Sequence, residues 1–171
     1  MSRLKRIFLA IILGCLILTG CSEAKVNTKL EIVNSSILDA LDAFHANELY
    51  LFKNILIQVL HEEKSEKIKG MFELYLLNNN KSVPYILSLN NSTIIPIEDS
   101  TILIELYKKL HEYVNLLNSR LENKTLKNYE KEVEELIKLI EKSPTQSILS
   151  KENMVKNESL LITLNKKLEN K

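Results

Sequence analysis

Between residues 30 and 61, apolar residues recur at steps of three or four, which is typical of one face of an α-helix. Glu48 alone interrupts this row, whose apolar members are Leu30, Val33, Ile37, Leu41, Phe44, Leu51, Ile55 and Val59. Further apolar residues flank the row between residues 49 and 60, so the apolar arc is wider there. The pattern predicts a central helix that ends near His61 and is buried on more than one side.

The rest of the chain predicts further helices, each with its own apolar face. These faces lie at about residues 68–76, 102–121, 129–140 and 148–168. Before the last face, Ser143-Pro144-Thr145-Gln146 supplies a capping residue, a proline for the first helical position and a glutamine three residues after the cap. We therefore predict an all-α fold, an antiparallel bundle of four or five helices.

Residues 83–97 permit two interpretations. Apolar residues alternate with polar ones on both sides of Asn90-Asn91, which could form the two-residue turn of a small β-hairpin. Pro84 could equally open a short helix. The sequence leaves both alternatives open.

Composition favours helices over sheets. The 171 residues include only three glycines, three prolines and no tryptophan, too few for a turn-rich sheet protein. This length is that of one domain with a modest core. One helical domain is therefore expected.

The first 21 residues follow a different pattern. Arg3, Lys5 and Arg6 form a basic front, and residues 7–18 form an apolar run. This run of roughly 12 residues is shorter than the about 20 that a permanent transmembrane helix needs. The order of basic, apolar and small residues is typical of a cleaved signal peptide.

The end of this segment, Leu18-Thr19-Gly20-Cys21, resembles the lipobox of bacterial lipoproteins. The resemblance implies that the sulfur of Cys21 carries diacylglycerol and that cleavage makes Cys21 the first residue of the mature protein. It also implies a lipid anchor on the extracytoplasmic side of the cell membrane. A rival box ends at Cys15, but it would leave an apolar core of about seven residues, at the lower edge of the usual range. The resemblance covers only this end of the chain.

Three regions follow from these patterns. Residues 1–20 are the lipoprotein signal peptide. Residues 21–28 are polar after the cysteine and lack a strong periodicity, so they are expected to be a tether. Residues 29–171 are the helical bundle domain.

Charge and cysteine content exclude several classes of function. Loss of the three basic signal residues changes the formal net charge from +1 to −2, so no basic surface indicates nucleic-acid binding. Cys15 leaves with the signal peptide and Cys21 carries the lipid. We therefore expect no disulfide, no thiolate metal site and no cysteine nucleophile in the mature domain.

Few residues suggest chemistry. Asp42-x-x-His45 is one half of a di-metal pattern that needs a second such unit, and the sequence has none, so we expect no metal and partly exposed histidines.

Glu48 either sits at the bundle edge beside a lysine or is a buried carboxylate with a raised pKa that binds a cation or sets the helix register. No glycine-rich phosphate loop and no serine nucleophile motif occurs. We expect neither a cofactor nor enzyme activity.

The expected function is therefore a non-enzymatic protein-binding or adaptor module at the membrane. Tyr50 and Phe52 are the predicted partner contacts, because the apolar arc of residues 49–60 would leave an exposed patch if the bundle did not cover it. The alternative is a small-ligand carrier or sensor with an apolar pocket inside the bundle. The six tyrosines lie on or beside apolar faces, where they would pack in the core or line such a pocket.

Overall fold

The computed structural model describes residues 33–61, 65–79, 81–123 and 125–169. Every regular element in these ranges is a helix and none is a strand, so the predicted all-α class is confirmed. The signal peptide, the tether and Cys21 lie outside the described residues. The chain divides after Ala40 into two units, and the second unit is Leu41–Lys171.

Seven helical segments follow one another along the described chain. They are the helix at residues 33–61, α2 (Ser65–Asn79), α3 (Ser82–Asn91), α4 (Ile97–Glu122), the 3-10 helix η1 (Leu126–Tyr129), α5 (Glu130–Ile140) and α6 (Lys151–Glu169). None of the described helices is both long and apolar enough to cross a membrane.

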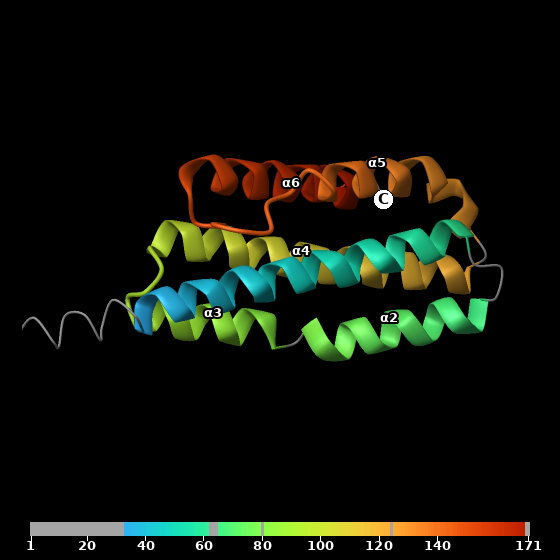
Figure 1. Cartoon of the computed structure of the whole chain (residues 1–171). Helices are drawn as coiled ribbons and strands as arrows, with labels where there is room; N and C mark the ends of the chain where they lie inside the picture. Colours follow the sequence, from blue (N-terminus) through green and yellow to red (C-terminus); the bar gives the residue numbers. More distant parts are fainter. Residues whose placement is uncertain (1–32, 62–64, 80, 124, 170–171) are drawn as a thin grey trace, which may run out of the picture. The chain divides into compact units, whose positions relative to one another are not determined.

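Within the unit Leu41–Lys171, α4 contacts α2, α3, η1 and α6. Figure 1 shows α2 and α3 in succession along one flank and α5 and α6 along the opposite flank. An ion pair of 3.1 Å between Lys167 and Glu135 joins α6 to α5. The helices thus form a bundle around α4 and the segment 41–61.

The segment 41–61 is the central helix that the apolar row predicts. Phe52 packs against Tyr75 of α2 and Tyr113 of α4, with ring centroids 6.1 Å apart in both pairs. Phe44 packs against Tyr85 of α3 at 4.8 Å. Tyr50 is the one apolar or aromatic residue between positions 49 and 60 that is exposed, so the bundle covers the wide apolar arc.

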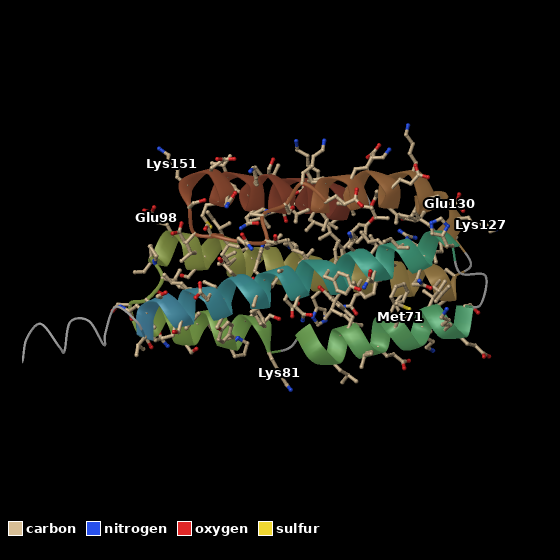
Figure 2. The ribbon with its side chains drawn as sticks, in the orientation of Figure 1. Met71, Lys81, Glu98, Lys127, Glu130 and Lys151 are labelled. Carbon is tan, nitrogen blue, oxygen red and sulfur yellow. The ribbon has the colours of Figure 1, made fainter. Side chains whose placement is uncertain are left out.

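Residues 82–91 form the short helix α3, and the hairpin alternative is wrong. Ile86 and Leu89 are both buried, and their spacing of three places them on one helical face. Pro84 falls in the first turn, where a missing N–H costs nothing. Lys81, which precedes the helix, extends away from the bundle (Figure 2).

The predicted helix start at Ser143-Pro144 is wrong, because α6 begins only at Lys151. The intervening residues form a loop that inserts Ile148, which is fully buried, into the core. The Asp42 carboxylate accepts hydrogen bonds from the backbone N–H groups of Ser147 and Ile148. Ser147 has a φ of 49°, which is incompatible with a helix at this position.

Candidate functional site

Five polar side chains meet in the otherwise apolar interior of the unit Leu41–Lys171. We call His45, Glu48, Ser82, Tyr107 and Asn157 the buried polar cluster. Glu48 is 4% exposed and the other four are 0% exposed. A buried polar side chain destabilises a helical core unless it is hydrogen-bonded. The buried polar cluster is therefore the candidate functional site in this interior.

Four helices contribute to the cluster. His45 and Glu48 lie three residues apart on the central helix, so they share one face. Tyr107 lies on α4, Ser82 is the first residue of α3, and Asn157 lies on α6. The cluster therefore crosses the bundle from α6 through the central helix and α4 to α3.

His45 and Tyr107 form the hydrogen bond at the middle of the cluster. His45 Nδ1 and the Tyr107 hydroxyl oxygen are 2.9 Å apart. Burial lowers the pKa of His45 to about 4, although Asn157 and Asp42 act in the opposite direction. The ring is thus neutral at pH 7, and either the hydroxyl donates to a bare Nδ1 or a protonated Nδ1 donates to the hydroxyl.

Glu48 is close enough to Tyr107 for its charge to act on the phenol. Burial raises the pKa of Glu48, and a side-chain hydrogen bond with Ser82 acts in the opposite direction. Burial also raises the pKa of Tyr107 well above its usual value, and the nearby carboxyl of Glu48 adds to this shift. The phenol therefore stays protonated and can donate a hydrogen bond.

Five polar atoms of the cluster have no well-aligned hydrogen bond to another residue that the structure describes. They are His45 Nε2, Glu48 Oε2, Ser82 Oγ and both amide atoms of Asn157. Asn157 nevertheless interacts with His45, and Ser82 with Glu48, through side-chain hydrogen bonds that shift the pKa of the titratable partner. Each end of the cluster thus brings together polar groups from two helices.

The structure decides between the two interpretations of Glu48. Glu48 is a buried carboxylate with a raised pKa and does not sit at an exposed edge. The expectation of a partly exposed His45 is wrong, since this ring is fully buried. His45 and Glu48 continue the row of Leu41 and Phe52 at steps of four, three and four, and this spacing was the available signal.

Sequence analysis missed Asn157 and Ser82. Asn157 lies three residues after Met154 and three before Leu160, both buried, so its position on the inner face of α6 could have been inferred from spacing. Ser82 gave no such signal, because the helix that it begins was itself ambiguous.

Tyr50 and Phe52 do not lie on one surface. Tyr50 is 58% exposed, whereas Phe52 is 0% exposed and packs between Tyr75 and Tyr113. Two residues apart on a helix means different faces. Phe52 is therefore a core residue, which corrects its predicted role as a partner contact, and Tyr50 remains a predicted contact.

The remaining candidate residues lie apart from the cluster. His61 is exposed and His111 is half-buried. Tyr113 is buried and donates a hydrogen bond of 2.6 Å to Glu132. Across the described ranges, no three or more histidine, cysteine, aspartate or glutamate side chains are grouped so that they could hold a metal ion.

Comparison with known proteins gives no relative from which a function could be transferred. No protein-family model matches the chain, and no curated protein or solved structure matches it significantly. The function has to be argued from the residues of this chain.

Proposed function

We propose that this protein is a lipid-anchored lipoprotein of the bacterial cell envelope that binds another protein on the extracytoplasmic side of the membrane. The anchor is supported by the basic front, the apolar run and the Leu18-Thr19-Gly20-Cys21 box. The binding role is supported by one surface of the central helix.

The exposed aromatic ring of Tyr50 is the observation that carries the binding role. Ala43, Asn47, Tyr50, Asn54 and Ile57 follow one another at steps of four and three, so they share one helical face, which we call the outer stripe. The first three are exposed and the last two are half-buried.

The outer stripe has the composition of a binding surface. None of its members is charged, although 26% of the residues in the chain are. Interface centres are depleted of charged residues and enriched in tyrosine. A tyrosine also offers a large contact area at a small cost in side-chain entropy. We therefore place the partner contact on the outer stripe, with Tyr50 at its centre.

Site-specific photo-crosslinking in intact cells tests this role. A photoreactive amino acid replaces Tyr50 in one strain and the exposed Glu66 of α2 in a matched control. We expect a discrete crosslinked protein from position 50 and none from position 66. The charge-introducing substitution Asn47→Lys should abolish the crosslink while circular dichroism shows an unchanged helical fold. Equal crosslinking from both positions, or an Asn47→Lys variant that crosslinks normally, would contradict the proposal.

A further inference from the structure

We propose that α6 carries a self-association surface, which pairs in antiparallel orientation with the same helix of a second copy of this chain. The surface is a row of five exposed residues that we call the α6 stripe: Glu152, Val155, Ser159, Ile162 and Lys166. It shares no residue with the outer stripe. The self-association is therefore independent of the proposed protein-binding role, and either one can fail without the other.

The α6 stripe is a continuous seam along the helix. Its members follow one another at steps of three, four, three and four, the spacing by which one helix faces another in a coiled coil. Val155 is 59% exposed and Ile162 is 46% exposed. The opposite face of α6 is the one that packs into the bundle, through the buried residues Met154, Asn157, Leu160, Leu164 and Leu168. The helix thus has a second, narrower face whose apolar residues are open to a partner.

The order of residue types in the α6 stripe points to a second copy as that partner. From its N-terminal end the stripe runs acidic, apolar, serine, apolar, basic, so the reversed order is complementary to the forward one. Antiparallel pairing about a two-fold axis at Ser159 places Val155 opposite Ile162 of the second copy. It also places Glu152 opposite Lys166 of the second copy. The two-fold symmetry repeats both contacts on the other side of the axis.

The charges at the two ends favour the antiparallel direction. Parallel pairing would set each residue opposite its own copy, so Glu152 would face a glutamate and Lys166 a lysine. Lys166 forms no ion pair with another residue that the structure describes. Glu152 bonds to Lys156 at 2.7 Å, but its side chain is 81% exposed, and a carboxylate accepts several hydrogen bonds. Both charges are therefore available to the second copy.

The size of the α6 stripe defines the kind of association. The seam of one 19-residue helix is narrower than the surface that stable complexes bury, which totals about 1,200–2,000 Å². Complementary charges contribute more to specificity than to affinity. We therefore expect a weak, reversible pairing of defined direction. Covalent trapping in intact cells detects such a pairing without requiring that it survive purification.

Cysteine trapping of the full chain tests the contact. Ser159→Cys places a thiol at the two-fold axis, where two Cβ atoms come within the about 4.5 Å that a disulfide permits. Mild oxidation should therefore give a disulfide-linked dimer. Glu73→Cys is the matched control, because Glu73 is exposed on α2, along the flank opposite α6 (Figure 1). The wild type, with Cys15 and Cys21 as its only cysteines, sets the background.

Two further variants test the direction of pairing. Glu152→Cys and Lys166→Cys are expressed together on chains that carry different epitope tags. The antiparallel arrangement predicts a disulfide between the two kinds of chain and none when either variant is expressed alone. A parallel arrangement predicts the reverse.

Charge reversal then tests the end contacts. In Ser159→Cys chains, the additional substitution Glu152→Lys should remove most of the disulfide-linked dimer, because lysines then face each other at both ends. Adding Lys166→Glu should restore the dimer, which also shows that the loss did not arise from misfolding. The proposal is overturned if Ser159→Cys dimerises no more than Glu73→Cys or crosslinks to a different protein. It is equally overturned if Glu152→Cys pairs with itself, or if the double charge reversal does not restore the dimer.

Discussion

At the scale of single residues, burial has opposite consequences for His45 and Glu48. It lowers the pKa of the histidine to about 4 and raises that of the glutamate. In each case the neutral form is favoured, because the interior solvates charge poorly. His45 therefore resists protonation, and Glu48 resists ionisation. The free energy of unfolding should depend on pH through both residues.

The first prediction concerns acid. The pKa of His45 falls from 6.5 in the unfolded chain to about 4 in the folded one, so the unfolded state binds more protons between these values. The unfolding free energy contributed by His45 is complete above pH 6.5 and is lost as the pH falls towards 4. The total loss is about 3 kcal/mol. Urea unfolding at several pH values measures it.

His45→Gln should remove most of this pH dependence, because glutamine does not titrate. The matched control is His61→Gln, which replaces an exposed histidine and should leave the dependence unchanged. An identical acid profile for the wild type and His45→Gln would show that His45 is not the buried neutral residue described here.

The second prediction concerns Glu48. Its folded pKa lies above the ordinary 4.5, so as the pH rises above 4.5 the unfolded chain ionises more readily and stability is lost. Glu48→Gln keeps the shape and cannot ionise. The variant should therefore unfold at a higher urea concentration than the wild type at pH 7. At pH 4 the two should differ less. A lower urea midpoint for Glu48→Gln at pH 7 would contradict this.

The third prediction compares two aromatic residues that are close in sequence. Phe52→Ala should lower the unfolding free energy by about 3–5 kcal/mol, because it empties a fully buried position between two tyrosine rings. Tyr50→Ala should change it by about 0.5 kcal/mol or less, because surface substitutions rarely do more. Chemical denaturation measures both changes. Similar losses for the two variants would contradict the assignment of Phe52 to the buried face and Tyr50 to the exposed face of the helix.

At the scale of elements, the loop between α5 and α6 depends on a residue far away in the chain. The Asp42 carboxylate accepts two backbone hydrogen bonds from residues that are 105 and 106 positions later. The Asn153 side chain donates to the carbonyl oxygens of Gln146 and Ser147. These contacts hold the loop so that Ile148 enters the core.

The fourth prediction is the loss of this clamp. Asp42→Ala removes both acceptors, and hydrogen bonds to a charged group contribute about 1.5–3 kcal/mol each. We expect the unfolding free energy to fall by about 3 kcal/mol, the lower limit for two such bonds, and the amide hydrogens of Ser147 and Ile148 to exchange faster. Asp42→Asn retains one acceptor and should show smaller changes. Unchanged exchange in Asp42→Ala would mean that Asp42 does not hold the loop.

The helices could be predicted from the sequence to the extent that their signals are local and periodic. The apolar row of the central helix spans many turns, and the described part of this helix extends to His61. The helix start predicted at Ser143-Pro144 was wrong because the residue types that cap helices also occur in turns. The loop conformation there depends on hydrogen bonds to the distant Asp42, which no local sequence pattern reveals. Residues 83–97 were ambiguous because the segment is short.

The buried polar cluster could be predicted only in part for a related reason. Glu48 stood out because it interrupts an apolar row, and its burial was one of two alternatives. His45 lies on the same face, but we predicted it to be partly exposed, as histidines usually are, and its position in the row was given less weight. Asn157 and Ser82 belong to other helices, and only the packing of the bundle brings them to the central helix.

At the scale of the whole molecule, the proposed protein combines a folded helical unit with a lipid on Cys21, which precedes that unit in the chain. One acyl chain holds a protein at a membrane only marginally, and stable anchoring needs a second chain or signal. The diacylglyceryl group implied by the lipobox resemblance supplies two chains. The lipid would therefore suffice to hold the bundle and its outer stripe at the membrane.

The most direct test of this account is metabolic labelling of cells with a fatty acid analogue, followed by isolation of the protein. The wild type and Cys15→Ala should both carry the label and sediment with membranes. Cys21→Ala should lose the label, because it removes the sulfur that the lipid requires. Label that persists on Cys21→Ala and disappears from Cys15→Ala would contradict the assigned anchor, and an unlabelled wild type would contradict lipid anchoring altogether.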